Sequence, residues 1–164
     1  MELKYLIGDA ANPIHKPTII AHCCNDIGGW GRGFVLALSK KYPKAEISYR
    51  DWFKTGTPVL GDVQFVQVTD DICVANMIGQ HDVKWNKHIP PIRYGSLNQC
   101  FEQVYEKAHD EKLTVSMPRL GAALAGGSWY EVEKIIKLQM TVDSYIYTLE
   151  QQKNEWPGTI YSAD

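Results

Sequence analysis

The chain has 164 residues, of which 45% are apolar and 22% are charged, and its formal net charge is −2. This length and composition suit one globular domain that buries roughly 70% of the surface its unfolded chain would expose. The nearly neutral charge and the lack of a long basic run argue against a duplex-DNA footprint, and no apolar stretch approaches the ~18 residues of a membrane span.

Strand and helix patterns alternate along the chain. Apolar segments predict six strands, at residues 2–7, 17–24, 63–69, 72–78, 113–117 and 144–149. Helical patterns lie at residues 33–41, 43–53, 93–109 and 129–140. The third and fourth strands meet at the turn 69–71, which predicts a hairpin and therefore an antiparallel pair.

This alternation, with one hairpin, predicts an α/β fold in which a mixed sheet has helices on both sides. The residues after Glu150 lose all periodicity and predict a tail that either packs on the surface or frays. We therefore expect one domain over residues 1–150 and a C-terminal tail over residues 151–164.

The segment 22–34 carries the strongest functional signal. A predicted strand leads into Asn25, four glycines follow within six positions (Gly28, Gly29, Gly31 and Gly33), and a helix then begins. Glycines at such a junction let backbone N–H groups approach a ligand, and the N-terminus of a helix attracts anions. These features predict a ligand that carries phosphate. A glycine loop that serves only as a connection is the alternative.

Two more segments follow predicted strands, the turn Gly8-Asp9-Ala10 and a loop rich in glycine and alanine at residues 121–129. Ligands of such folds bind at the carboxyl ends of the strands, so two loops rich in small residues suit a diphosphate held from both sides. Ser128 also fits the simpler role of a helix cap. The chain has neither the spacing of a P-loop nor the Gly-x-Gly-x-x-Gly spacing of a Rossmann fold.

The four cysteines are expected to be reduced, buried thiols. Cys23 and Cys24 are adjacent in a predicted strand, so their side chains point to opposite faces and do not easily hold one metal ion. No Cys-x-x-Cys is present, and we expect no structural metal. The first residues, Met-Glu-Leu-Lys-Tyr, lack the layout of a signal peptide, so we expect a cytosolic protein.

These motifs together resemble the macro domain family. The resemblance is carried by residues 8–10, 22–34, 117–121 and 124–127 and by Trp129, and it runs from about residue 1 to residue 149. It implies a three-layer α/β/α fold with a mixed sheet of roughly six strands that binds ADP-ribose without a cofactor. The first glycine loop, followed by Tyr42-Pro-Lys-Ala-Glu46, is most similar to the fungal ADP-ribose 1″-phosphate phosphatases and their bacterial relatives.

The resemblance also implies roles for single residues. Asp9 accepts a hydrogen bond from the adenine amine and the Ala10 N–H meets the ring, with a turn residue as the alternative for Asp9. Asn25 binds the hydroxyls of the distal ribose. One side of the diphosphate is expected to meet the N–H groups of Gly31, Arg32 and Gly33 in the first loop, and Phe34 is a further ligand-binding residue there. The other side is expected to be covered by the second loop, at Gly121, Ala122, Ala123, Leu124, Ala125 and Gly126.

For catalysis, the resemblance points to His22 with Asn25. His22 matches a histidine proposed as catalytic in the phosphatase group, and histidine is the usual general acid or base near neutral pH. A strand histidine that is bonded to a neighbour is the alternative. The titratable side chains of Asp26, His81 and Asp82 also lie near the predicted cleft, without a spacing that identifies a role.

Three positions depart from other catalytic members of the family. Val35 stands where hydrolases of ADP-ribosyl esters carry an acid. Gln80 and Ala125 stand where the eukaryotic glycohydrolases carry a lysine and an aspartate. The resemblance thus favours ADP-ribose binding with hydrolysis of ADP-ribose 1″-phosphate. The alternatives are a non-catalytic reader of ADP-ribose or of ADP-ribosylated macromolecules, and a hydrolase that removes ADP-ribose from modified targets.

Overall fold

A computed structural model describes residues 2–122 and 125–163 of the chain. All ten predicted strands and helices are present. The largest differences from the predicted boundaries are two residues: the second helix ends at residue 55 instead of 53, the fourth strand at 80 instead of 78, and the third helix at 111 instead of 109. The elements are β1 (Leu3–Ile7), β2 (Thr18–Asn25), α1 (Phe34–Lys41), α2 (Pro43–Thr55), β3 (Val63–Thr69), β4 (Ile72–Gln80), α3 (Tyr94–Glu111), β5 (Thr114–Pro118), α4 (Trp129–Gln139), β6 (Ser144–Thr148) and a 3₁₀ helix (Glu150–Glu155).

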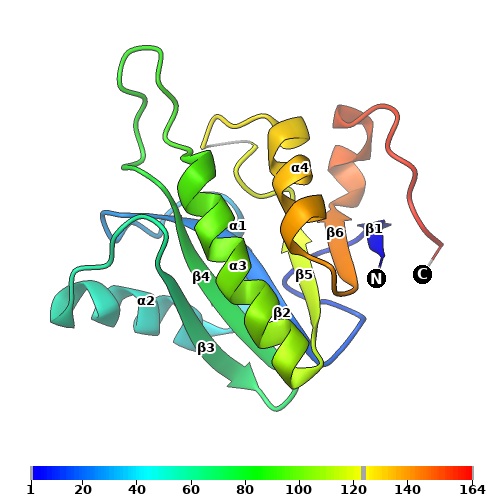
Figure 1. Ribbon diagram of the computed structural model, residues 1–164, viewed down its shortest axis with the longest axis horizontal. Coiled ribbons are helices and arrows are strands. Elements are labelled where there is room, and N and C mark those ends of the chain that lie inside the picture. Colours follow the sequence, from blue (N-terminus) through cyan, green and yellow to red (C-terminus); the bar gives the residue numbers. More distant parts are fainter. Residues whose placement is uncertain (1, 123–124, 164) are drawn as a thin grey trace.

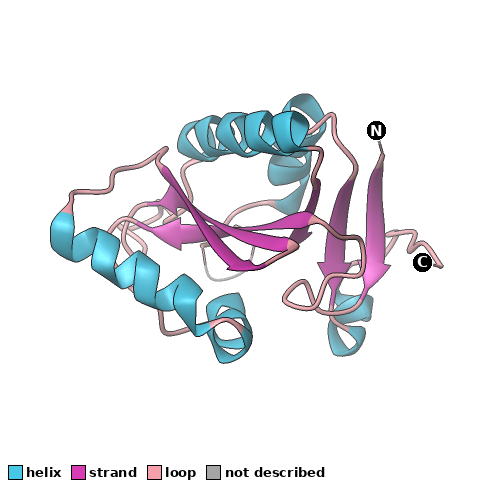
Figure 2. Cartoon of the chain, turned by 90° about the horizontal axis from the view of Figure 1, so that it is seen from below, coloured by secondary structure: helices cyan, strands magenta, loops and turns pink. Residues whose placement is uncertain are grey.

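The six strands form one mixed sheet in the order β1-β6-β5-β2-β4-β3. Neighbouring strands are parallel except for β3 and β4, which pair in antiparallel register across the predicted hairpin. The parallel strands β2, β4 and β5 consequently end at the same edge of the sheet. Helices cover both faces, as Figure 2 shows, so the expected three-layer α/β/α architecture is confirmed.

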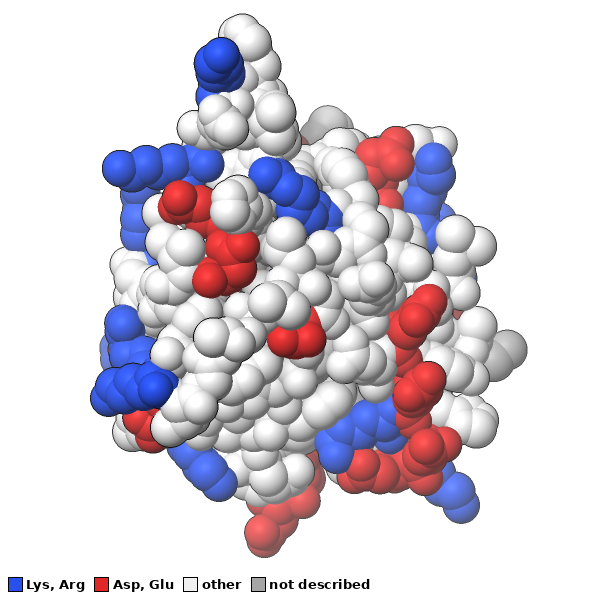
Figure 3. All heavy atoms as spheres, turned by 60° about the vertical axis from the view of Figure 1, so that its left-hand side comes forward, with Lys and Arg blue, Asp and Glu red and all other residues white. Residues whose placement is uncertain are grey.

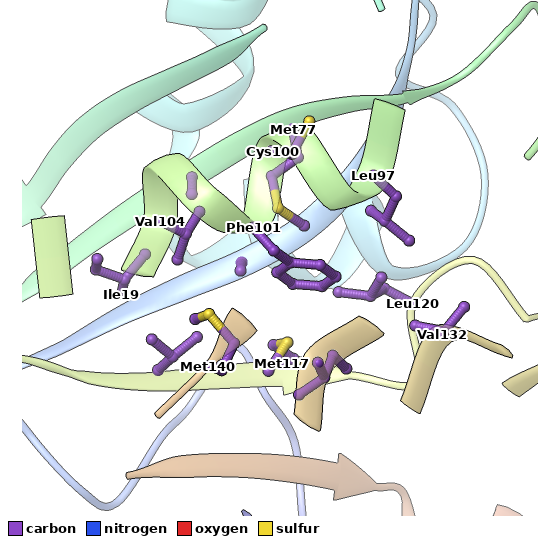
Figure 4. Packing of buried hydrophobic residues seen from close by; sticks show 14 of the residues in the cluster. Ile19, Met77, Leu97, Cys100, Phe101, Val104, Met117, Leu120, Val132 and Met140 are labelled. Carbon is purple, nitrogen blue, oxygen red and sulfur yellow. The ribbon is translucent and has the colours of Figure 1, made fainter. Parts of the chain in front are cut away.

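The two faces of β2 supply two separate cores. Successive side chains of a strand point to opposite faces, and Ile19 and Ala21 pack with α3 and α4, whereas Ile20 and Cys24 pack with α1 and α2. In Figure 4, Phe101 of α3 lies at the centre of the first core, among side chains from the sheet and α4. The fully buried apolar faces explain why the central strands read as nearly continuous apolar runs.

Two segments extend beyond the sheet and its helices. Residues 81–92, called the arm here, connect β4 to α3 and project from the molecule (Figure 1). Short antiparallel contacts join Gln80 to Ile92 at the base of the arm and Asn86 to Ile89 near its tip. The C-terminal segment runs back to the sheet edge, where Tyr161 pairs with Tyr5 of β1.

Charged side chains of both signs are interspersed over the face shown in Figure 3. Basic side chains on this face alternate with acidic ones rather than forming a continuous band. Within the part of the chain that the structure describes, no helix combines the length and the apolar character needed to cross a membrane.

Candidate functional site

A cleft of about 640 Å³ lies at the sheet edge where β2, β4 and β5 end. Its walls come from the first loop (residues 26–33), the start of the arm and the second loop (residues 119–128). This placement follows from the parallel pairing, because the carboxyl ends of parallel strands meet at one edge. The predicted site residues that line the cleft are His22, Asn25, Gly31, Arg32, Gly33, Phe34, Gly121 and Ala125.

The predicted adenine-binding residues lie beside the cleft rather than in its lining. Asp9 Oδ1 accepts a hydrogen bond from the Ala11 N–H at 2.9 Å, so this carboxylate organises a turn. Ala10 is buried with Tyr147, and Phe34 packs against the same cluster while also lining the cleft. Ala10 is thus connected to the cleft through Phe34.

The remaining predicted diphosphate contacts lie in the second loop. Ala122 and Gly126 are outside the cleft lining, whereas their neighbours Gly121 and Ala125 line it. Ala123 and Leu124 lie outside the described residues. The N–H of Gly127 donates to the carbonyl of Gly121 at 2.8 Å, which closes the loop on itself.

The Asn25 side chain organises the first loop. Its Oδ1 accepts hydrogen bonds from the N–H groups of Ile27 at 3.1 Å and Gly29 at 2.8 Å, and its Nδ2 donates to the Gly29 carbonyl at 2.9 Å. A Cβ on residue 29 would lie 3.0 Å from Asn25 Nδ2, so glycine permits this close approach. An amide group carries two N–H donors, and the hydrogen bond to Gly29 uses one of those of Asn25.

The hydrogen bonds of Asn76 fix the protonation of His22. Asn76 Nδ2 donates to the carbonyl of Ala45 at 3.3 Å and to Gln64 Oε1 at 3.1 Å. The Asn76 oxygen therefore faces His22 Nε2, at 2.5 Å, as an acceptor. This arrangement assigns the proton of the neutral imidazole to Nε2 and leaves Nδ1 with its lone pair.

His22 lies on the floor of the cleft with only 2% of its surface exposed. The rings of Trp30 and Phe34 pack around it, with centroids 5.4 and 5.8 Å away, and Cys24 Sγ lies 3.8 Å from Nδ1. Burial lowers the pKa of His22 to about 4, although the hydrogen bond to Asn76 acts in the opposite direction. His22 is therefore neutral at pH 7.

The arm is fastened to both loops. On one side, Asp26 of the first loop accepts hydrogen bonds from His81 Nδ1 and from the N–H of Asp82, both at 2.7 Å. Partial burial raises the pKa of Asp26, but these two hydrogen bonds outweigh that effect and the pKa lies below its usual value. On the other side, the Ile92 N–H donates to the carbonyl of Ala125 at 3.0 Å.

The described residues of the cleft lining include four basic side chains and no acidic one. Arg50 is paired with Glu46 at 2.8 Å, and Arg119 is surrounded by aromatic rings. Within the described residues, Arg32 and Lys84 have no acidic partner. The cleft is therefore positively charged and suited to an anionic ligand.

The three positions at which the sequence departs from catalytic members of the family it resembles all line this cleft. Val35 and Ala125 bring no polar side chain to it, and Gln80 donates to the carbonyl of Asp82 at 2.9 Å. None of these residues can act as a nucleophile or general base. Among the described residues, no group of three His, Cys, Asp or Glu side chains is arranged to hold a metal ion.

The lining residues to which the sequence analysis gave no role include Arg50, Val83, Lys84 and Arg119. The sequence position of Val83 and Lys84 could have indicated them, because they follow β4, which ends at the same sheet edge as β2. Arg119 directly follows β5 and offered the same signal. Arg50 lies within α2 and reaches the cleft only through the packing of that helix, where its Nη2 donates to the carbonyl of Trp30 at 3.2 Å.

The fold and cleft together define an α/β/α domain with a basic cleft between two glycine loops. No family model matches the chain. A protein of unknown function from Bacteroides thetaiotaomicron is 47% identical, with a TM-score of 0.87 over 90% of this chain and 98% of that one. A macrodomain protein from Streptomyces coelicolor is 40% identical, with a TM-score of 0.79 over 90% of this chain and 99% of that one. The chain belongs to the macrodomain family.

More distant relatives differ in length and in name. Chromodomain-helicase-DNA-binding protein 1-like of Danio rerio is 30% identical over 82% of this chain. This chain spans only 14% of the length of that protein and 18% of the length of the Mus musculus protein of the same name. ADP-ribose 1″-phosphate phosphatase of Lodderomyces elongisporus is 23% identical over 92% of this chain and 100% of its own. The DarTG protein of Thermosipho africanus, solved in complex with ADP-ribose, shares the fold at 16% identity, with a TM-score of 0.64 over 82% of this chain and 38% of that one.

Proposed function

We propose that the chain binds ADP-ribose in the cleft between its two glycine loops. The ADP-ribose complex of a structural relative supports this ligand class. In this chain, Gly31 and Gly33 before the start of α1 line the cleft, and Gly121 of the second loop lines it as well. A diphosphate between them would accept hydrogen bonds from backbone N–H groups and would face the basic side chains of the lining.

The proposed reaction is hydrolysis of ADP-ribose 1″-phosphate to ADP-ribose and phosphate. The observation that carries this proposal is the charge of the cleft, with four basic side chains and no acidic one among the described lining residues. Among the residues that the structure describes, Arg32 and Lys84 have no acidic partner, and they suit the additional negative charge of a terminal phosphate. The name of the fungal relative supports the same substrate.

In the reaction, water attacks phosphorus and the bond between phosphorus and the 1″ oxygen breaks. The proton that the attacking water gives up passes to the 1″ oxygen, and inorganic phosphate leaves. Positive charge at Arg32 and Lys84 would stabilise the transferring phosphoryl group. His22, neutral in the fold, is the proposed proton acceptor through Nδ1, with Asn25 orienting the distal ribose.

Calorimetry with ADP-ribose tests the proposed binding. An assay of phosphate release from ADP-ribose 1″-phosphate tests the proposed hydrolysis. We expect micromolar affinity for ADP-ribose, on the order of −8 kcal/mol. Lys84→Met should lower the rate of phosphate release by about tenfold or more. Lys112→Met is the matched control, because Lys112 lies next to the start of β5, at the opposite end of that strand from the cleft. No binding at millimolar ADP-ribose would refute the proposal.

A non-catalytic reader of ADP-ribose is the second candidate function. It is favoured by Val35, Gln80 and Ala125, which place neither a carboxylate nor an amine at the cleft positions where other members of the family carry them. Tight binding without phosphate release would support this candidate. Release of ADP-ribose from a modified protein or nucleic acid would instead identify a hydrolase that acts on ADP-ribosylated targets.

A further inference from the structure

Arg119 lies between the cleft and a second, smaller groove. It directly follows β5, begins the second loop and lines both the cleft and a groove of about 390 Å³. The other walls of this groove are Tyr5, Trp129, Glu133 and the C-terminal residues 157–160. One side chain thus connects the ligand site with the C-terminal segment.

The guanidinium group of Arg119 is enclosed by three aromatic rings. Its central carbon lies 4.4 Å from the ring centroid of Trp156, 4.8 Å from that of Tyr5 and 5.4 Å from that of Trp129. Two of its N–H groups are also used, because Nε donates to Thr148 Oγ1 at 3.0 Å and Nη2 donates to Thr159 Oγ1 at 2.9 Å. Because aromatic rings surround the planar guanidinium group and two of its N–H groups donate hydrogen bonds, the Arg119 side chain is held in one position.

The C-terminal segment supplies two of these contacts, from Trp156 and Thr159. It is fixed in turn to the sheet edge, where the Ser162 N–H donates to the Tyr5 carbonyl at 2.8 Å and Tyr161 pairs with the same strand. Trp156 also packs against the core formed with α3 and α4. The segment is thus also held by contacts with β1, outside the second loop.

Both ends of the second loop meet at this place. Arg119 is the first residue of the loop, and Trp129, the first residue of α4, follows its last residue. The Trp129 Nε1–H donates to the Tyr5 hydroxyl at 3.0 Å, and that hydroxyl donates to Glu133 of α4. Arg119 and Trp129 therefore share Tyr5 as a neighbour, and Arg119 also stacks on both tryptophans.

We propose that the C-terminal segment, residues 156–162, contributes to ligand binding by positioning the second loop. It holds Arg119 in one position and thereby fixes both ends of the second loop, so that the N–H groups of the loop are ready for the diphosphate. Arg119 acts here as a positioning residue, through the loop backbone. This inference rests on the proposed binding of ADP-ribose.

Trp156→Ala and Trp156→Phe test the inference. Trp156→Ala removes the nearest ring from Arg119 and should raise the Kd for ADP-ribose by about tenfold. Trp156→Phe keeps a ring and should restore most of the affinity. The matched control is Tyr130→Ala, since Tyr130 also carries a basic side chain over its ring, that of Lys134 at 5.3 Å, but is 67% exposed on α4.

A second measurement does not depend on the ligand. The amide NMR signals of Gly121, Gly126 and Gly127 should shift in Trp156→Ala and stay in place in Tyr130→Ala. If Trp156→Ala does not fold, Thr159→Val removes only the acceptor for Arg119 Nη2, and it should shift the same signals. Unchanged signals in the folded variant would overturn the inference. Absence of ADP-ribose binding by the unaltered protein would refute the proposed function, while the NMR comparison would still decide the coupling.

Discussion

Burial of His22 makes the stability of the protein depend on pH. The pKa of His22 falls from 6.5 to about 4 on folding, because burial opposes the charged form. Between these values the unfolded chain binds more protons than the folded chain. The free energy of unfolding is therefore not reduced by this residue above pH 6.5. It decreases as the pH falls towards 4, and His22 accounts for up to about 3 kcal/mol of the decrease.

Urea unfolding at a series of pH values between 7.5 and 4.5 measures this effect. His22→Gln should be less stable overall but should lack the contribution of His22 to the pH dependence. His88→Gln is the control, since His88 is exposed on the arm. An unchanged pH dependence in His22→Gln would contradict the prediction.

If His22 also handles a proton, phosphate release by the His22→Gln variant should fall by about 10²-fold or more.

Asp9 is predicted to have two separable roles. Its Oδ1 holds the turn to Ala11, and the predicted contact with adenine needs the negative charge. Asp9→Ala should weaken ADP-ribose binding by ~1.5–3 kcal/mol and should also loosen the turn. Asp9→Asn retains an oxygen for the turn, so calorimetry should show weaker binding without a loss of thermal stability. Wild-type affinity in Asp9→Asn would leave Asp9 with only its turn role.

At the scale of elements, the first loop depends on the side chain that ends β2. Asn25→Ala leaves the N–H groups of Ile27 and Gly29 without their acceptor and should cost about 1–3 kcal/mol of stability. ADP-ribose affinity should fall as well, because the loop N–H groups lose their fixed positions. Asn25→Asp keeps the accepting oxygen but replaces the Nδ2 donor with an oxygen that faces the Gly29 carbonyl, so it should recover only part of the stability. Denaturant unfolding and calorimetry measure the two effects, and equal stability of all three proteins would contradict this role.

At the scale of the whole molecule, the thiols should be inert until the chain unfolds. All four cysteines are free, and three of them are buried. Burial raises the pKa of Cys23 to about 12 and also raises the pKa of Cys24, Cys73 and Cys100, so the reactive thiolate is scarce at neutral pH. A thiol reagent should label the native protein slowly and the denatured protein rapidly at four sites.

The same protein is predicted to hold no structural metal. Cys23 and Cys24 point to opposite faces of the sheet, toward different cores. Elemental analysis of the purified protein should find no stoichiometric zinc. One zinc ion per chain, lost together with stability on treatment with a chelator, would contradict this prediction.

The sequence determined the elements, the order of the layers and the position of the two glycine loops. Periodicity is a local property, and β3 begins and ends at the predicted residues. The loops follow strands that alternate with helices, a pattern that makes the strands parallel and brings their ends to one edge. Residues that act from these loops, such as Asn25 and Gly121, were therefore accessible from the sequence.

The tertiary structure decided what the neighbours of those loops are. Lys84 reaches the cleft because the arm is fastened to Asp26 and Ala125, which are far from each other in the sequence. The C-terminal segment was predicted only as a tail, yet Trp156 lies on Arg119. Such contacts join residues that share no local pattern. They form only when the whole sheet and its helices bring separate segments of the chain to the same place.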